Sequence, residues 1–414
     1  MNILIFHQYY LSQGDPGISR FNQFAKYWAD QGHKITVIAG TVHVQFLAEQ
    51  DKKKYSGKFI IREKQTPQIE VIRTYVSPAY NTSFRGRLWA YFTYTLSSLL
   101  AGFVCGKQDI IIATSPPLFV AIPGYIISRL KRIPLVFEVR DLWPKFAIDT
   151  GVLTNKTFIK LATWLENWIY KKASLINVLT PAFKEYLTKE KGIAEKKIIY
   201  IPNGADLDIF QPGSRDNWVR QKHAWGNKFV VIYVGAHGLA NNLMQLVLAA
   251  EKLQSNKDIL FVLVGDGMEK PNLKQVAKEK GLENIQFFDP IPKEQVIDFI
   301  NAADVGTAIL QAHFITTYPN KVFDYMTCAK PIILPIDGAC RKLVVDDAAA
   351  GIFVAPNNPE EFKEKLLLLY NDSNMAKTLG QNGHAFVQKF FDRKKLAQQY
   401  LVELANLVSK KQSV

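Results

Sequence analysis

Short apolar runs alternate with longer amphipathic segments from the start of the chain. The run at 2–6 is followed by a loop rich in Gly, Pro and Ser, a helical pattern at 21–32 and an apolar run at 35–40. This order predicts a strand, a crossover helix and a parallel strand. Further predicted strands occupy 109–114, 133–139, 174–180 and 197–203. We therefore predict a parallel, doubly wound sheet in the first half of the chain.

The same rhythm restarts in the second half. Predicted strands lie at 229–235, 259–267, 285–289, 306–310 and 331–336, with helical patterns at 243–254, 272–281 and 293–304 between them. The stretch 202–216, rich in Pro, Gly and Asp, links the halves. We predict two Rossmann-like α/β domains, at 1–205 and 206–385. A helical tail at 386–414 is expected to pack back on the first domain.

Composition supports this division and a globular chain. The chain has 414 residues, of which 48% are hydrophobic and 21% charged, so two domains are expected. The first residues contain no basic region or small-residue cleavage site, which predicts a cytoplasmic protein. The three cysteines are widely spaced without a CxxC pair. They are expected to be buried thiols, with no zinc site or disulfide framework.

The net charge of +14 is concentrated in the first half. Residues 1–205 hold 27 Lys and Arg against 14 Asp and Glu, whereas residues 206–414 hold 24 against 23. This asymmetry indicates an anionic partner for the first domain, such as a membrane surface, a phosphorylated lipid or nucleic acid. A basic surface that merely keeps the protein in solution is the alternative.

Two segments of the first half are candidates for membrane contact. Residues 88–106 carry no charge over 19 positions, close to the ~20 needed to span a bilayer. Because a spanning helix would disrupt the sheet, we expect a buried or surface-inserting helix. Residues 52–64 are basic with interleaved aromatics. They are either an exposed hairpin or loop, or a contact with phosphate headgroups.

Ligands of open α/β sheets bind beyond the carboxyl ends of the strands, so two facing domains predict a cleft there. Helix N-termini at such an edge suit a diphosphate. In the first domain, the glycine-bearing turn at 14–20 follows the first strand. Gly17 gives the backbone freedom there, and Arg20 is a candidate phosphate ligand. A plain turn with a solvated arginine is the alternative.

The sequence RDLWP at 140–144 follows another strand of the first domain. Asp141 is a candidate for accepting the proton of an acceptor hydroxyl, and Arg140 for binding phosphate. Alternatively, Asp141 caps a helix or turn, and Trp143 and Pro144 only pack.

Four stretches resemble family 4 retaining glycosyltransferases of GT-B fold: IYIPNGADLDIFQP (199–212), LVGDGMEKPNLKQVAKEKGLENIQFFDPIPKEQVIDFINAADV (263–305), NKVFDYMTCAKPII (320–333) and GIFVAPNNPEEF (351–362). The likeness covers nearly the whole chain. ATSPPLFVA (113–121) and FEVRDLWPKFAIDTG (137–151) resemble the bacterial surface-polysaccharide branch of L-fucosamine and colanic acid transferases. The resemblance implies transfer from a nucleoside diphosphate sugar, expected to be UDP-linked, to an undecaprenyl-diphosphate-linked saccharide in O-antigen or capsule synthesis.

The family's E-x7-E motif is half present. The resemblance gives Asp324 the position of the second acid, whose carboxylate binds the ribose hydroxyls of the donor. The position of the first acid is occupied by Thr316. Thr316 remains able to hydrogen-bond a hydroxyl, without the charge assistance of a carboxylate. The same comparison places Asn320, Thr317 and Ile291 among the donor-binding candidates.

The loop in which the family often carries an arginine and a lysine reads VGAHGLANN at 234–242 here, with His237 as its only candidate cation. Gly235 and Gly238 allow a close backbone approach. Lys321, at the start of a predicted helix, is our candidate for the diphosphate. The alternative is a surface pair between Lys321 and Asp324, worth a few tenths of a kcal/mol.

Asp206 and Asp208 form a DXD sequence, which is the metal-binding signature of a different transferase fold. Here they follow Pro-Asn-Gly in a linking loop, where aspartate side chains commonly stabilise turns. We expect no metal and no cofactor. The resemblance implies no protein nucleophile, so Asp141 is an orienting group or base. The protein is expected at the inner face of the cell membrane, bound peripherally.

The sequence is also compatible with two other functions. A non-hydrolysing sugar-nucleotide epimerase shares the double Rossmann shape, but few carboxylates follow the predicted strands. A nucleic-acid-binding protein would explain the basic first half, but no helix-turn-helix, RNP or zinc pattern is present, so we expect no nucleic acid partner.

Overall fold

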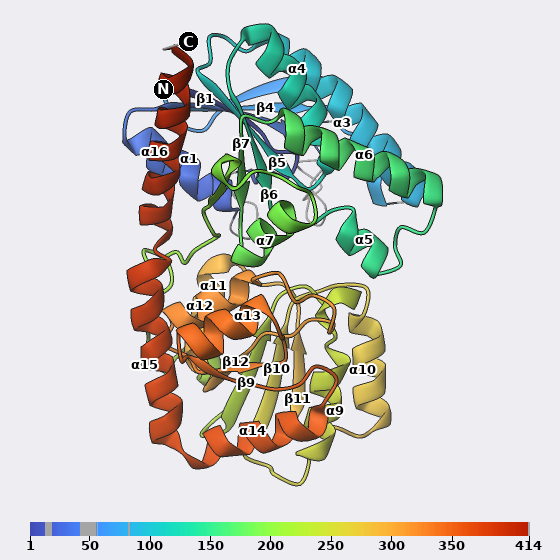
Figure 1. Ribbon diagram of the computed structural model, residues 1–414. Helices are drawn as coiled ribbons and strands as arrows, with labels where there is room; N and C mark the ends of the chain where they lie inside the picture. The colour runs from blue at the N-terminus through green and yellow to red at the C-terminus, as the bar shows by residue number, and fades with distance from the viewer. Residues whose placement is uncertain (13–18, 42–54, 56, 82, 413–414) are drawn as a thin grey trace. The chain divides into compact units, whose positions relative to one another are not determined.

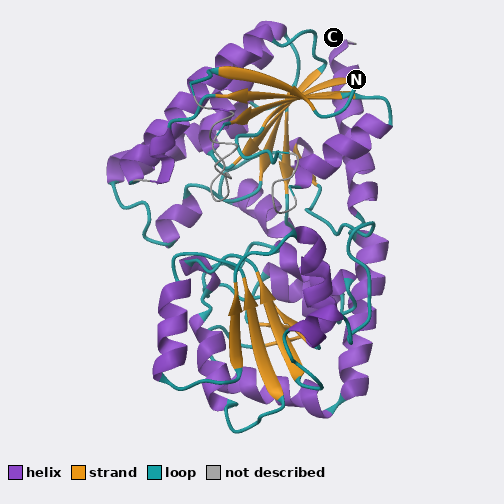
Figure 2. Ribbon diagram, turned by 180° about the vertical axis from the view of Figure 1, so that it is seen from behind, coloured by secondary structure: helices purple, strands orange, loops and turns teal. Residues whose placement is uncertain are grey.

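The computed structural model describes residues 1–12, 19–41, 55, 57–81 and 83–412 (Figure 1). The described chain divides into two compact units. Unit 1 comprises Met1–Pro202 and Lys394–Val414, and unit 2 comprises Asn203–Arg393. In each unit the strands form one sheet with helices on both faces (Figure 2).

Unit 1 contains an eight-stranded sheet in the order β3-β4-β2-β1-β5-β6-β7-β8. Its strands are β1 (Asn2–Phe6), β2 (Lys34–Gly40), β3 (Ile60–Lys64), β4 (Ile69–Thr74), β5 (Ile110–Ser115), β6 (Leu135–Val139), β7 (Leu175–Val178) and β8 (Ile198–Tyr200). Its helices are α1 (Arg20–Asp30), η1 (Pro78–Asn81), α3 (Phe84–Val104), η2 (Leu118–Val120), α4 (Ala121–Lys131), α5 (Lys145–Asp149), α6 (Lys156–Lys172), α7 (Pro181–Lys189), η3 (Glu195–Lys197) and α16 (Arg393–Gln412).

The parallel strands lie where the apolar runs predict them, with one addition at the sheet edge. Strands β3 and β4 form an antiparallel hairpin, and β4 pairs in parallel with β2. The basic segment 52–64 therefore ends in the edge strand of this hairpin. Its residues 52–54 and 56 lie outside the described part of the chain.

Different helices cover the two faces of this sheet. Helices α3, α4, α6 and α7 bury apolar side chains against one face. Helices α1 and α16 cover the other, where Leu396, Tyr400 and Leu404 of α16 join the core. The indole Nε1 of Trp28 in α1 donates a 2.8 Å hydrogen bond to the carbonyl oxygen of Ala397. The last helix thus completes the hydrophobic core of the first unit.

Helix α3 contains most of the uncharged segment 88–106. Ala90, Tyr94, Ser97 and Ala101 are buried on one side of the helix, and the other side is exposed and apolar. Within the described residues, the structure contains no helix long and apolar enough to cross a membrane. The segment therefore forms a surface helix of the sheet.

Unit 2 contains a six-stranded parallel sheet in the order β11-β10-β9-β12-β13-β14. Its strands are β9 (Phe229–Val234), β10 (Ile259–Val264), β11 (Ile285–Phe288), β12 (Val305–Thr307), β13 (Ile332–Leu334) and β14 (Gly351–Phe353). Its helices are α8 (Trp218–Lys222), η4 (Leu239–Asn241), α9 (Met244–Lys252), α10 (Lys270–Glu279), α11 (Lys293–Ala302), α12 (Asn320–Thr327), α13 (Ala339–Arg341), η5 (Lys342–Asp347), α14 (Pro359–Asn371) and α15 (Ser373–Phe390).

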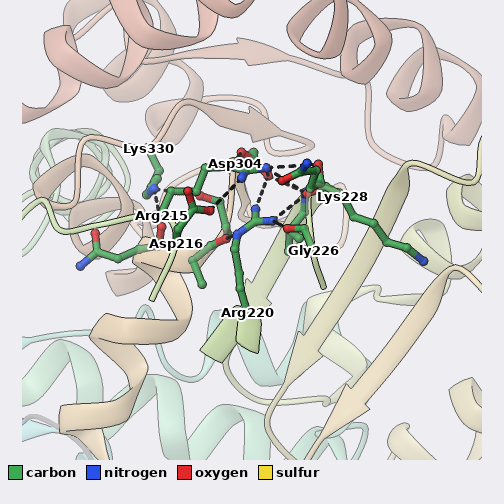
Figure 3. Close-up of polar contacts among 12 residues, drawn as sticks. Arg215, Asp216, Arg220, Gly226, Lys228, Asp304 and Lys330 are labelled. Carbon is green, nitrogen blue, oxygen red and sulfur yellow. Dashed lines mark hydrogen bonds and ion pairs between the residues drawn. The ribbon is translucent and has the colours of Figure 1, made fainter. Parts of the chain in front are cut away.

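A charged cluster fastens the start of unit 2 to its sheet (Figure 3). Asp304, just before β12, accepts hydrogen bonds from Arg215 Nε at 2.6 Å, Arg220 Nη2 at 2.7 Å and the Val230 amide at 2.8 Å. Arg220 also donates to the carbonyl oxygens of Ala302, Gly226 and Lys228. The carboxylate and the buried guanidinium therefore satisfy each other and the surrounding backbone.

The boundary between the tail and unit 2 follows from Arg393. Its guanidinium donates to the carbonyl oxygens of Asn203 and Gly204 and pairs with the Asp206 carboxylate. Arg393 thereby ties the end of α15 and the start of unit 2 together. The structural division falls after Arg393, eight residues beyond the predicted boundary at 385.

Candidate functional site

Two glycines bring the loops after β9 and β10 into close contact. A side chain at Gly265 would place a Cβ 1.9 Å from the Gly235 carbonyl oxygen, and Gly265 has φ +143°. Gly235 has φ +147°, and a Cβ there would lie 3.1 Å from Lys321 Nζ. Because only glycine is compatible with these conformations and spacings, the sequence builds an open backbone turn at this edge.

Lys321, in the first turn of α12, lies against the end of β9. Its Nζ is 2.9 Å from Tyr233 Oη and 4.1 Å from the centroid of that ring. Since Tyr233 Oη donates to the Ala236 carbonyl oxygen at 2.8 Å, it accepts from the lysine. Burial lowers the pKa of Lys321 to about 7, although the charge of Asp324 opposes the shift. Lys321 therefore lies beside the glycine turn, and its role toward a diphosphate stays a prediction.

His237 is enclosed between the two glycine loops. Its amide donates to the Asp266 carbonyl oxygen, and its own carbonyl accepts from the Glu269 amide. Neither ring nitrogen has a hydrogen-bond partner among the described residues, and the side chain is buried. Burial, reinforced by the charge of Lys270, lowers the pKa of His237 to about 4. His237 is therefore neutral at pH 7, so it offers an unpaired ring nitrogen rather than a second positive charge.

The remaining candidates of unit 2 come from the same edge of the sheet. Asp324 is partly exposed one helical turn after Lys321, and Thr316 and Thr317 are partly exposed in the loop after β12. Asn320 begins α12, and its side-chain oxygen accepts from Asn203 Nδ2 at 2.7 Å. These residues share the carboxyl side of β12. Their roles toward a donor stay predictions.

Gly238 and Ile291 complete the predicted set. Gly238 precedes η4, and its carbonyl oxygen accepts from the Asn241 amide. Ile291 is partly exposed in the loop between β11 and α11. Both follow strands that end at the same edge of the sheet.

Sequence reasoning missed Lys270, a buried cation at this edge. Its Nζ donates to the carbonyl oxygens of Gly265 and Phe288 and to Asp289 at 2.6 Å. The lysine therefore fixes the glycine loop after β10. The signal in the sequence was a lysine five residues after Gly265, at the start of a helix.

Asp141 and Arg140 follow β6 at the carboxyl edge of the sheet of unit 1. The Arg140 side chain donates from Nε to the Ser115 carbonyl oxygen at 3.1 Å, which holds it beside the end of β5. Burial raises the pKa of Asp141, against the opposing charge of Arg140. Helix α5 has Pro144 at its N-cap position and no side-chain cap, so Asp141 does not cap it. A carboxylate with a raised pKa suits proton transfer.

Arg20 has internal partners. Its side chain is buried, lies 3.5 Å from the Glu138 carboxylate and donates to the carbonyl oxygens of Ile201 and Pro202. The arginine is therefore not solvated, and its described contacts join α1, β6 and the segment that follows β8. Its proposed phosphate contact is not tested by these contacts. Gly17 lies outside the described residues.

The DXD sequence also has a structural explanation. Asp206 is buried and pairs with Arg393, which is itself bonded to the neighbouring backbone. Asp206 therefore stabilises the chain at the start of unit 2. The expectation of a metal-independent reaction stays a prediction. All three cysteines are buried thiols, as predicted.

Comparison with known families matches both halves of the chain. The family described as "Glycosyltransferase Family 4" matches residues 19–209, and "Glycosyl transferases group 1" matches residues 214–386. A colanic acid biosynthesis glycosyl transferase of Escherichia coli, WcaI, is 26% identical over 298 residues, covering 70% of this chain and 71% of the relative.

Two further similarities concern a lipid-linked sugar and a nucleotide sugar. An Escherichia coli UDP-Gal:alpha-D-GlcNAc-diphosphoundecaprenol alpha-1,3-galactosyltransferase is 31% identical over 157 residues, covering 36% of this chain and 39% of that protein. The Anabaena protein HepE, solved in complex with UDP-glucose, has a TM-score of 0.72 at 19% identity, covering 98% of this chain and 100% of HepE.

The two parallel-sheet units and these matches define a glycosyltransferase of GT-B fold. The chain belongs to family 4 of these enzymes, as the resemblance of its sequence motifs predicted.

Proposed function

We propose that the protein is a retaining glycosyltransferase that moves a sugar from UDP to an undecaprenyl-diphosphate-linked saccharide. The observation that carries the proposal is the cation Lys321 beside the open glycine turn of Gly235. A leaving diphosphate gains negative charge as the sugar departs, and an ammonium group held there stabilises it. The named substrate of the undecaprenol-linked galactosyltransferase supports the acceptor, and the UDP-glucose complex of HepE supports the donor.

In this proposal the two units bind different reactants. Unit 2 holds the nucleoside diphosphate with Lys321, Asp324 and the glycine backbone. Unit 1 holds the acceptor, whose hydroxyl proton is directed by Asp141. The basic balance of the first half suits an anionic membrane surface at the inner face of the cell membrane. The product would serve surface-polysaccharide synthesis, such as O-antigen or capsule.

The direct test is transfer of radiolabelled sugar from a panel of UDP- and GDP-sugars to undecaprenyl-diphosphate saccharides in detergent. We expect a UDP-sugar to give a lipid-linked product with the donor's anomeric configuration, read by NMR. EDTA is expected to leave the rate unchanged, because metal-free stabilisation by Lys321 is proposed. An inverted product would contradict the retaining mechanism, and a loss of about tenfold or more with EDTA would contradict metal independence.

Two controls separate the alternatives. Incubation of each nucleotide sugar without acceptor, followed by NMR, detects an epimer if the protein is an epimerase. Binding to duplex DNA and RNA in rising salt detects a nucleic-acid-binding protein. Either result without sugar transfer would replace the proposed function.

The Lys321→Met substitution is expected to weaken UDP binding about 10- to 100-fold at pH 6.5, because a charged hydrogen bond to phosphate contributes about 1.5–3 kcal/mol. In the unaltered protein, UDP affinity should fall as pH rises through about 7, where Lys321 loses its proton. Lys321→Arg should bind UDP without that pH dependence, since arginine stays charged. Calorimetric titration between pH 6 and 9 measures all three proteins.

The matched control is Lys278→Met, which removes an exposed lysine of α10 in the same unit. It should bind UDP like the unaltered protein.

Because the pKa of Lys321 in the fold lies below its unfolded value of ~10.4, the lysine destabilises the fold at neutral pH, and this cost disappears as pH rises toward 10. Lys321→Met should therefore not lower the melting temperature at pH 7. Equal UDP affinity in Lys321→Met and the unaltered protein would remove Lys321 from the donor site.

A further inference from the structure

An apolar groove opens on the surface of unit 1 between α3 and α6. Its ten lining residues are all apolar, and its volume is about 160 Å³. Leu88 of α3 lies on one side, Phe158 and Leu161 of α6 lie on the other, and Phe119 and Trp143 also line it. An exposed apolar surface of this kind often marks a site where another molecule binds, because binding removes the apolar side chains from water.

The groove reaches the carboxyl edge of the sheet. Phe119 belongs to η2, which follows β5, and Trp143 follows β6. Trp143 stands two residues after Asp141, and its amide donates to the Asp141 carbonyl oxygen at 2.9 Å. One end of the groove is therefore built by the same loop that carries the candidate catalytic carboxylate.

The apolar surface continues along both helices. On α6, Phe158 is 41%, Leu161 54% and Trp164 59% exposed. On α3, Leu100 is 45% and Phe103 51% exposed, beyond the groove itself. Figure 1 shows α3 and α6 as long neighbouring helices of unit 1, and α4 packs against both. The groove thus lies within a larger exposed apolar face.

Cations flank the groove at the start of each helix. Arg85 is exposed three residues before Leu88 on α3, and Lys160 is exposed four residues before Trp164 on α6, so each shares the helix face of a residue that lines the groove. Within the described parts of the chain, neither of these two cations forms an ion pair with a carboxylate. An apolar groove with a cationic rim matches an amphiphile that has a hydrocarbon chain and an anionic head.

We propose that this groove binds the isoprenoid chain of the acceptor lipid, at the part of the chain that is attached to the diphosphate. The inference deepens the proposed function and rests on it for the identity of the acceptor. A cavity of about 150 Å³ lined by Leu, Ile and Phe accommodates a benzene-sized group, so about 160 Å³ matches a five-carbon branched unit. The groove holds the first isoprene unit, and the cations of the rim meet the diphosphate attached to it.

Farnesyl diphosphate tests the groove without any sugar. Its binding is measured by calorimetry in buffer with saturating UDP, which occupies the donor site, and inorganic diphosphate serves as the probe without a chain. We expect farnesyl diphosphate to bind at least about tenfold more tightly than inorganic diphosphate, because an apolar group the size of a leucine side chain becomes buried. Leu161→Gln and Phe158→Gln should each remove most of that difference and leave the affinity for inorganic diphosphate unchanged.

The matched controls are Leu100→Gln and Phe103→Gln, which make the same change at similarly exposed positions of α3 outside the groove. They should keep the affinity for farnesyl diphosphate. Equal losses in the α3 and α6 variants would overturn the groove assignment, as would farnesyl diphosphate binding no more tightly than inorganic diphosphate. If the α6 variants keep that affinity but no longer float with anionic phospholipid vesicles, the face binds the bilayer and the proposal is wrong.

The outcome is separable from the proposed function. Chain-selective binding of farnesyl diphosphate without sugar transfer to any lipid acceptor would support the groove and contradict the transferase assignment. Sugar transfer to undecaprenyl-diphosphate acceptors with unchanged Michaelis constants in Leu161→Gln and Phe158→Gln would support the transferase and contradict the groove.

Discussion

The Asp141→Asn substitution is expected to lower kcat by about 10²- to 10⁴-fold, the range supplied by a positioned general base. Asparagine keeps the size of the side chain but cannot take the acceptor proton. Because burial raises the pKa of Asp141, the active carboxylate is lost at a higher pH than for an ordinary aspartate. The rate of the unaltered enzyme should therefore fall as pH decreases through this raised pKa, and Asp141→Asn should lack that acid limb. Initial rates of sugar transfer between pH 4.5 and 8 measure both effects.

Two readouts separate a catalytic role from a structural one. UDP affinity should be unchanged in Asp141→Asn, since Asp141 belongs to unit 1 and the donor candidates belong to unit 2. Asp149→Asn is the matched control, because Asp149 lies in the following helix and pairs at the surface with Lys145. It should retain the full rate. If Asp141→Asn keeps kcat within about threefold of the unaltered enzyme, Asp141 is not the base.

The Asp304→Ala substitution is expected to destabilise unit 2 by about 3–5 kcal/mol, because it leaves the buried guanidinium of Arg220 without its carboxylate. For a unit of this size, that change corresponds to a fall in melting temperature of roughly 10 °C. Differential scanning calorimetry measures the shift.

Asp216→Ala is the matched control for this cluster. Asp216 also pairs with Arg215, but its side chain is 79% exposed. An exposed pair contributes about 0–1 kcal/mol, so Asp216→Ala should change the melting temperature little. Equal effects of the two substitutions would show that the cluster in Figure 3 does not stabilise the unit.

Most strands of both sheets followed from the sequence because a strand buried on both faces is a short continuous apolar run. The runs at 2–6 and 259–267 correspond to β1 and β10 within a few residues. The short strand β14 was not predicted, and the hairpin of β3 and β4 did not follow either. Its first strand is partly exposed and carries charges, so its composition resembles that of a loop.

Single residues were harder to interpret than strands. Lys321 was selected from its position at a helix start, and the structure adds its contact with Tyr233 and its lowered pKa. Arg20 was interpreted as a phosphate ligand or a solvated residue, and its burial against Glu138 contradicts only the second interpretation. A side chain's partners depend on elements far apart in the chain, which a local pattern does not specify.

The sequence by itself determined the two α/β halves and the family, because apolar periodicity and motif spacing are local properties of the chain. Only the tertiary structure decided which charges are satisfied internally and which face the site edges. Arg220 with Asp304 and Arg393 with Asp206 are pairs brought together by folding, whereas the groove between α3 and α6 arises from helices packed on one sheet. Burial and pairing depend on this packing, and they set the pKa values and the exposed apolar surface.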